Sequence, residues 1–220
     1  MIFKRIVKFL GFESNRKLLG KKFTNIYEHN LFNGQESVSG PGSDLLQTEV
    51  LRNELPVVFK QYGITSVVDA PCGDFYWMQR VNLDAVKYIG CDIVEALIEK
   101  NNSLYASDLR SFRRADIVNE LLPKADVIFC RDCLVHLTYE QAILAISNFK
   151  KSGSTYMLTT TFPGRTNRDL GDILWRPLDL TRPPFNLPPP VHIILEKCTE
   201  NNGRYADKSM GLWRLKDVKL

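Results

Sequence analysis

Aspartates stand at or near the ends of four short apolar segments of the chain. Asp69 ends SVVD, Asp92 lies in KYIGCDI, Asp116 lies in ADI, and Asp132 follows DVIFCR. A carboxylate has enough acceptor sites for two ribose hydroxyls. In open α/β sheets, ligands bind beyond the carboxyl ends of the strands. If these segments are parallel strands, the acids predict a nucleoside-type ligand at one edge of the sheet.

The turn after the first segment, residues 69–73 (DAPCG), is built of small residues, so a ligand can approach its backbone. It contains one glycine, Gly73, and lacks the G-x-G-x-x-G spacing with which a helix N-terminus contacts a pyrophosphate. The turn therefore disfavours a nicotinamide dinucleotide. It favours a ligand that has an adenosine and a small charged tail.

His136 is the main candidate for proton transfer, because histidine titrates near neutral pH. It follows Asp132 by four residues, so in a helical turn both side chains reach one site. Either one is a candidate general base for a hydroxyl acceptor. The alternative is that His136 only forms local hydrogen bonds that shape its loop. We expect His29 and His192 to be structural.

From about residue 64, strand-like and helix-like segments alternate, which is typical of a parallel sheet with helices on both faces. We expect strands at 66–70, 87–93, 112–117, 126–131 and 154–162, a closing hairpin of 191–197 and 211–215, and helices at 44–62, 76–80, 94–104 and 139–150. These segments predict an α/β fold with a seven-stranded, mostly parallel sheet.

The order of these segments resembles the class I S-adenosylmethionine-dependent methyltransferases over residues 45–220. VVDAPCGDF, YIGCDI, ADI and DVIFCRDCLVHL resemble the family's first four motifs in order. The resemblance implies a Rossmann-like sheet with an antiparallel last strand and S-adenosylmethionine as cofactor, with S-adenosylhomocysteine as product. It also implies Asp92 on the ribose hydroxyls, and Asp116 on the adenine amino group with Ile117 near the ring. The residues expected at the cofactor are Asp69, Ala70, Pro71, Cys72, Gly73, Trp77, Asp92, Ile93, Asp116, Ile117, Arg131, Ser39 and Ser43.

The segments ahead of the domain and after the fifth strand depart from the regular alternation. We divide the chain into residues 1–43, a basic helix followed by a turn-rich segment with a lid loop, and 44–220, the methyltransferase domain. Ser43 is expected to cap the helix that follows the loop. ESVSGPGS in this loop resembles a subgroup of the family that carries a similar loop. Residues 163–190 form an insertion expected to bind the acceptor, through anion-binding arginines and a stacking tryptophan: Arg165, Arg168, Trp175 and Arg176. The alternative is that Trp175 and Phe185 only pack the insertion onto the body.

The net charge of +4 is concentrated at the N-terminus. Residues 1–22 hold seven cations against Glu13, a sum of +6, so the other 198 residues sum to −2. A nearly neutral body does not indicate nucleic-acid binding. Residues 1–22 read as an amphipathic basic helix that packs on the body, or as an arm that binds weakly to a membrane surface or docks a partner, or as a targeting peptide. Asp207 and Lys208 are expected to form a surface ion pair.

Five cysteines, an odd number, lie mostly in strand-like segments. We expect them to be buried thiols of a reducing, cytoplasmic compartment, and we expect no metal site. The sequence contains no apolar run of 18 residues, so no transmembrane helix is expected.

The sequence therefore predicts methyl transfer to an oxygen of a small molecule or glycan. It lacks N-P-P-Y after the fourth strand, which argues against amino methylation, and the Lys-Asp-Lys-Glu tetrad of cap-ribose enzymes. A sugar or anionic acceptor is preferred, as in polysaccharide modification. The alternatives are an enzyme of the same fold acting on a protein, lipid-linked or RNA acceptor, and a non-catalytic S-adenosylmethionine-binding module.

Overall fold

The computed structural model describes residues 18–171 and 174–220. The strands are β1 Ser66–Asp69, β2 Lys87–Asp92, β3 Arg110–Arg114, β4 Val127–Cys130, β5 Tyr156–Thr161, β6 His192–Leu195 and β7 Ser209–Arg214. The helices are α2 Glu49–Tyr62, α3 Glu95–Tyr105, α4 Tyr139–Lys151 and the short α5 Glu200–Gly203. Residues 18–28 are also helical, and single 3₁₀ turns lie at Pro41–Ser43, Met78–Arg80, Leu134–His136 and Leu215–Asp217.

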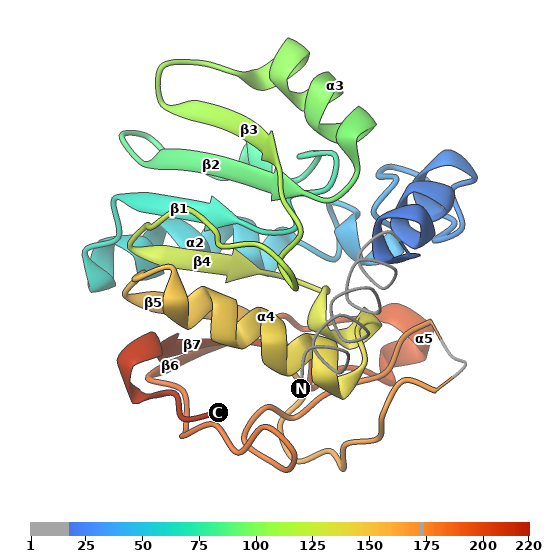
Figure 1. Cartoon of the computed structure of the whole chain (residues 1–220), viewed down its shortest axis with the longest axis vertical. Coiled ribbons are helices and arrows are strands. Elements are labelled where there is room, and N and C mark those ends of the chain that lie inside the picture. The colour runs from blue at the N-terminus through green and yellow to red at the C-terminus, as the bar shows by residue number, and fades with distance from the viewer. Residues whose placement is uncertain (1–17, 172–173) are drawn as a thin grey trace, which may run out of the picture.

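The seven strands of the described residues form one sheet in the order β3-β2-β1-β4-β5-β7-β6 (Figure 1). All neighbouring pairs from β3 to β5 are parallel, and β7 runs antiparallel to both β5 and β6. The predicted mostly parallel sheet with an antiparallel last strand is confirmed. The strand order reverses between β1 and β4, and such a switch point leaves a crevice at the carboxyl ends of the two strands.

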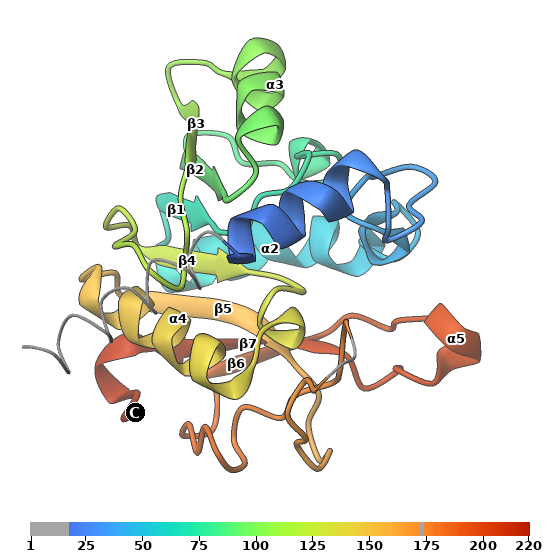
Figure 2. The ribbon, with the colours of Figure 1, turned by 45° about the vertical axis from the view of Figure 1, so that its right-hand side comes forward.

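Helices α2 and α4 cover opposite faces of the sheet (Figures 1 and 2). α2 buries Leu51 and Leu55 in one apolar cluster, and α4 buries Ile146 and Phe149 in another. Every residue of β4 is buried, as expected for a central parallel strand covered on both sides. This covered sheet is the rigid support from which the loops at its carboxyl edge project.

The start of α2 differs from the expectation. The helix begins at Glu49, with Thr48 at its N-cap position, so Ser43 does not cap it. Instead, Ser43 ends the 3₁₀ turn that starts at Pro41, and Asp44 has extended backbone angles of φ −66° and ψ 155° that no helix continues through. The extended backbone of Asp44 therefore separates this 3₁₀ turn from α2.

The N-terminal segment is also more helical than the sequence suggests. Residues 23–28 continue a helix where we expected a turn-rich segment. Most of the predicted basic helix, residues 1–17, lies outside the described residues. In the part of the chain that is described, no helix is long and apolar enough to cross a membrane.

Residues 163–190 contain no regular helix or strand where they are described. They pack onto the α4 face of the sheet through Leu178, Leu180 and Phe185, each of which is buried. In the same segment, Leu174 is 50% exposed. The predicted closing hairpin is present as β6 and β7, but its connection, residues 196–208, is long and includes α5.

Candidate active site

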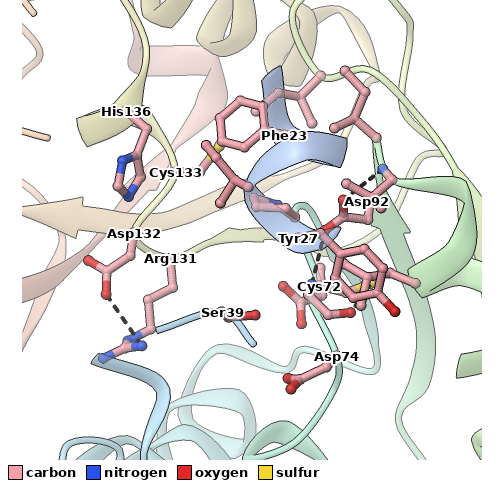
Figure 3. A pocket seen from close by; sticks show the side chains of 18 of the residues that line it. Phe23, Tyr27, Ser39, Cys72, Asp74, Asp92, Arg131, Asp132, Cys133 and His136 are labelled. Atoms are coloured by element: carbon pink, nitrogen blue, oxygen red, sulfur yellow. Dashed lines mark hydrogen bonds and ion pairs between the residues drawn. The ribbon is translucent and has the colours of Figure 1, made fainter. Parts of the chain in front are cut away.

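A cavity lies at the carboxyl ends of β1, β2 and β4, where the strand order reverses; we name it the first cavity (Figure 3). The N-terminal helical residues Leu19, Phe23, Ile26 and Tyr27 line it on one side, and the loop after residue 37 lines it on another. Of the residues expected at the cofactor, twelve line this cavity: Ser39, Ser43, Asp69, Pro71, Cys72, Gly73, Trp77, Asp92, Ile93, Asp116, Ile117 and Arg131. Ala70 is fully buried and does not line it, because its side chain packs in the α4-face cluster.

The turn after β1 brings backbone groups to the cavity. The amide of Cys72 donates to the carbonyl of Cys91 at 2.8 Å, which ties the turn to the end of β2. Gly73 has φ +54°, and a Cβ there would overlap the hydroxyl of Ser39. Glycine is therefore required at this position by both its backbone angle and its close neighbour.

The carboxylate of Asp92 accepts hydrogen bonds from the same turn and from the backbone just after β2. Its Oδ2 accepts from the amide of Gly73 at 3.1 Å, and its Oδ1 accepts from the amide of Val94 at 3.0 Å. Burial raises the pKa of Asp92 to about 6, although these backbone hydrogen bonds work in the opposite direction. Each carboxylate oxygen keeps a further acceptor site, so the residue is placed to bind hydroxyls of a ligand.

Asp69 is a second buried acid at the crevice. The hydroxyl of Tyr88 donates to its Oδ2 at 2.6 Å, and burial raises the pKa of Asp69 to about 8. Asp116 differs, because its carboxylate already accepts from the amides of Val118 and Asn119 at 2.9 and 3.3 Å. It shapes the turn after β3 while lining the cavity beside Ile117.

The loop of residues 37–43 is fixed to the turn by Asp74, which the sequence analysis did not select. Its two carboxylate oxygens accept from the hydroxyl of Ser37 at 2.9 Å and from the amide of Val38 at 3.1 Å. Ser37 is buried, and Ser39 lines the cavity. The sequence did contain a signal for this contact. Asp74 follows Pro71 and Cys72 closely, and the loop that it binds is rich in serine.

Four charged side chains form a network at the ends of β4, β6 and β7. Arg131 donates to Glu196 Oε2 from Nη2 at 2.7 Å and from Nε at 3.2 Å, and it donates to the carbonyl of Gly42 at 2.8 Å. Lys208 is buried and pairs with Asp132, so the expected surface pair of Asp207 with Lys208 is wrong. Although burial alone would raise it, the charges of Lys208 and Arg131 lower the pKa of Asp132 to about 2. A carboxylate held this way is a weak base.

His136 lies near Asp132, in the 3₁₀ turn after β4 (Figure 3). Its Nδ1 is 2.6 Å from the carbonyl oxygen of Leu174, which can only accept, so the proton is assigned to Nδ1. Nε2 has no hydrogen-bond partner among the described residues and carries the lone pair. Burial lowers the pKa of His136, and the ring of Phe32 packs on it with centroids 5.0 Å apart. The structure thus presents a neutral, oriented imidazole.

A second cavity adjoins the first and shares Phe32, Ser39, Asp132 and His136 with it. Trp175 lines this second cavity. The three arginines expected at the acceptor do not line either cavity. Arg165 pairs with Asp207 at 2.5 Å. Arg168 is exposed, and Arg176 is buried with Nη1 donating to the carbonyl of Leu134 at 2.8 Å.

The expectation of arginines at the acceptor is therefore not met, because two of them join distant segments of the chain. The five cysteines are buried and unpaired, as expected. Within the described residues, no group of three potential metal ligands comes together.

The chain thus has a Rossmann-like α/β fold, with two joined cavities at the carboxyl edge of its sheet. A possible exported protein from Bordetella parapertussis has this fold: TM-score 0.54, 11% identity, covering 76% of this chain and 67% of that one. Magnesium protoporphyrin IX methyltransferase from Synechocystis with bound SAH gives a TM-score of 0.43 at 19% identity over 54% of this chain. Human N-acetylserotonin methyltransferase in complex with SAM gives 0.48 at 12% identity over 60% of this chain.

The chain spans 57% of the Synechocystis enzyme's chain and 42% of the human enzyme's chain. At these identities the likenesses bear on the fold alone. No protein-family model and no curated protein sequence matches the chain.

Proposed function

We propose that this protein is an S-adenosylmethionine-dependent methyltransferase that acts on an oxygen of a small molecule or glycan. The observation that carries the proposal is that His136 lines both cavities and that its Nδ1 is bound by the Leu174 carbonyl, which leaves Nε2 unprotonated. The first cavity would hold the cofactor and the second the acceptor. We assign residues 44–220 to the methyltransferase domain, 1–43 to its extension and 163–190 to its acceptor-side insertion.

The lining of the first cavity fits a cationic nucleoside. Among the described residues, five carboxyl groups line it (Asp69, Asp74, Asp92, Asp116 and Asp132) against one cation, Arg131, which is itself paired with Glu196. A sulfonium and an ammonium group suit such a lining, whereas a pyrophosphate does not. Apolar side chains such as Ile93, Val94 and Ile117 line the part where an adenine ring would lie.

The cofactor, when bound, supplies an electrophilic methyl group. In this proposal Asp92 binds the ribose hydroxyls, Asp116 and Ile117 bind the adenine, and the turn with Gly73 accommodates the methionine tail. His136 Nε2 accepts the proton of the attacking hydroxyl, since its lowered pKa keeps it neutral at pH 7. The ion pair with Lys208 leaves Asp132 a positioning role.

The described structure gives less support to the two alternative functions that the sequence left open. A basic arm that docks a protein, lipid-linked or RNA acceptor would lie in residues 1–22, of which 1–17 are outside the described structure, and no described contact favours it. Weak membrane association through this arm and a cytoplasmic location stay predictions. A non-catalytic binding module is disfavoured, because it would not require an oriented base between two cavities.

Isothermal titration with S-adenosylmethionine and S-adenosylhomocysteine tests the proposal without knowledge of the acceptor. We expect micromolar binding, lost in Asp92→Ala, because hydrogen bonds to a charged group contribute about 1.5–3 kcal/mol each. Asp92→Asn, which keeps the side-chain size and one acceptor oxygen, should lose less. Asp84→Ala removes an exposed carboxylate outside both cavities and serves as the matched control.

Thermal melting of each variant separates a binding defect from unfolding, since Asp92 also ties the turn to β2. If the unmodified protein binds neither compound, the proposed function is wrong. If Asp92→Ala binds as well as the unmodified protein, the site assignment is wrong.

A further inference from the structure

The second cavity has an aromatic wall. The rings of Phe162, Trp175 and Tyr205 meet edge to face, with centroids 5.7 Å apart for Phe162–Trp175, 4.8 Å for Trp175–Tyr205 and 6.2 Å for Phe162–Tyr205. The guanidinium of Arg165 lies over Phe162 and Tyr205, at 5.6 and 5.1 Å, and is held by Asp207. Interlocked aromatic rings of this kind give a stiff apolar surface that suits another ring.

The second cavity also has a polar end, near Gly42. Three charged groups converge on Gly42: a Cβ built there would lie 3.3 Å from Glu200 Oε2, 3.4 Å from Asp132 Oδ2 and 3.6 Å from Lys208 Nζ. This cluster adds acceptors and a donor to a lining that also holds the aromatic wall. An occupant must therefore combine an apolar ring face with polar substituents.

The charges of this polar end disfavour an anion. Lys208, the lining cation, pairs with Asp132 and lies 3.7 Å from Glu196 Oε2, so its charge is already balanced. Glu200 remains as a further carboxylate in the lining. A phosphate or carboxylate placed here would meet two acids and, among the described lining residues, no unpaired cation, which costs free energy through repulsion and unmatched desolvation.

We propose that the second cavity is an acceptor subsite for an uncharged ring that carries hydroxyl groups, with the ring against Trp175 and one hydroxyl directed at His136 Nε2. This inference rests on the proposed function and replaces the preference for an anionic acceptor. The acceptor oxygen forms a bond to the methyl carbon as the carbon–sulfur bond breaks and its electron pair stays on sulfur. The hydroxyl proton passes to Nε2 and then to solvent, leaving a methyl ether and S-adenosylhomocysteine. A sugar and a phenol share this chemistry.

The test is formation of S-adenosylhomocysteine with matched pairs of acceptors. Methyl glucoside is compared with methyl glucuronide, and 4-methylphenol with 4-hydroxybenzoate, followed by a wider set of neutral glycosides and phenols with their carboxylated or phosphorylated counterparts. We expect kcat/KM for the uncharged members to exceed that of their anionic partners by about tenfold or more. The sugar and phenol arms show which ring the enzyme uses.

Variants of residues that line the second cavity test whether the acceptor binds there. Trp175→Ala should raise KM for the acceptor about tenfold, Trp175→Phe should restore most of it, and both should keep the affinity for S-adenosylmethionine. Gly42→Ala narrows the polar end without a backbone penalty, because φ is not positive there, and should also raise KM. Glu200→Gln should narrow the discrimination against anions. Leu121→Ala, an exposed apolar position outside both cavities, is the control.

The two proposals fail separately. If anionic members are the better substrates, or if a protein that binds S-adenosylmethionine turns over no member of the set, the inference about the acceptor is wrong. Failure to bind S-adenosylmethionine at all contradicts the proposed function itself.

Discussion

Replacement of His136 by alanine should abolish most methyl transfer while the cofactor still binds. The imidazole is held at Nδ1 by the Leu174 carbonyl at 2.6 Å and at its face by Phe32, which leaves Nε2 as an oriented proton acceptor. A positioned general base contributes about 10²–10⁴-fold to a rate. At about 1.36 kcal/mol per factor of ten, this is about 3–5.5 kcal/mol of transition-state stabilisation.

The pH dependence of kcat gives a second readout of the same group. Because burial lowers the pKa of His136 below its ordinary value, the neutral form is already dominant at pH 7. We expect kcat to rise with pH through the acidic range and to be level from about pH 7 upward. In His136→Ala this rise should disappear, and added imidazole should restore part of the rate.

The assay is S-adenosylhomocysteine formation with an acceptor identified from the neutral set, with cofactor affinity measured in parallel by titration. Phe32→Leu keeps the base but loosens its ring, so a loss of only a few-fold in kcat is expected from it. The reasoning is refuted if His136→Ala keeps more than a tenth of the activity, or if its kcat keeps the pH profile of the unmodified protein.

Three further predictions concern stability and cofactor binding. Because the pKa of Asp69 is raised to about 8, the ligand-free protein should lose stability as pH rises from about 4 to 8, and Asp69→Asn should flatten this slope in thermal melts. Gly73→Ala should weaken S-adenosylmethionine binding about tenfold by displacing Ser39, and Ser39→Ala in the same chain should recover part of the loss in titrations. Lys208→Met leaves Asp132 without its main partner and should destabilise the protein by about 3–5 kcal/mol in urea unfolding at pH 7. This deficit should shrink as the pH falls from about 4 to 2, because the stability that the lowered pKa of Asp132 contributes above about pH 4 is lost over that range.

The fold and the placement of the cofactor-side acids could be predicted because both depend on local patterns. A central parallel strand is apolar along its length, and an acid that ends it lies at the edge of the sheet wherever the strand pairs. Asp69, Asp92 and Asp116 therefore line one cavity as a direct consequence of strand direction. The prediction for Ala70 was wrong, because side chains alternate along an extended chain and that of Ala70, next to Asp69, is directed into the core.

The N-terminal helical residues that line the first cavity could have been predicted only in part. Leu19, Phe23, Ile26 and Tyr27 recur at helical spacing and share one face, so an amphipathic helix was visible in the sequence. That this face packs over the carboxyl ends of the strands depends on tertiary contacts. No spacing rule contains that information.

The acceptor side could not be predicted, because the function of a charged residue depends on what pairs with it. Arg165 and Arg176 looked available for an anion, yet their partners Asp207 and Leu134 each lie 42 residues away in the sequence. Lys208 meets Asp132 across 76 residues. A basic side chain that is neutralised within the fold positions loops and aromatic rings, whereas an unpaired one binds anions. The arginine-rich composition of the insertion thus suggested an anionic acceptor, whereas our proposal of an uncharged acceptor rests on these pairings.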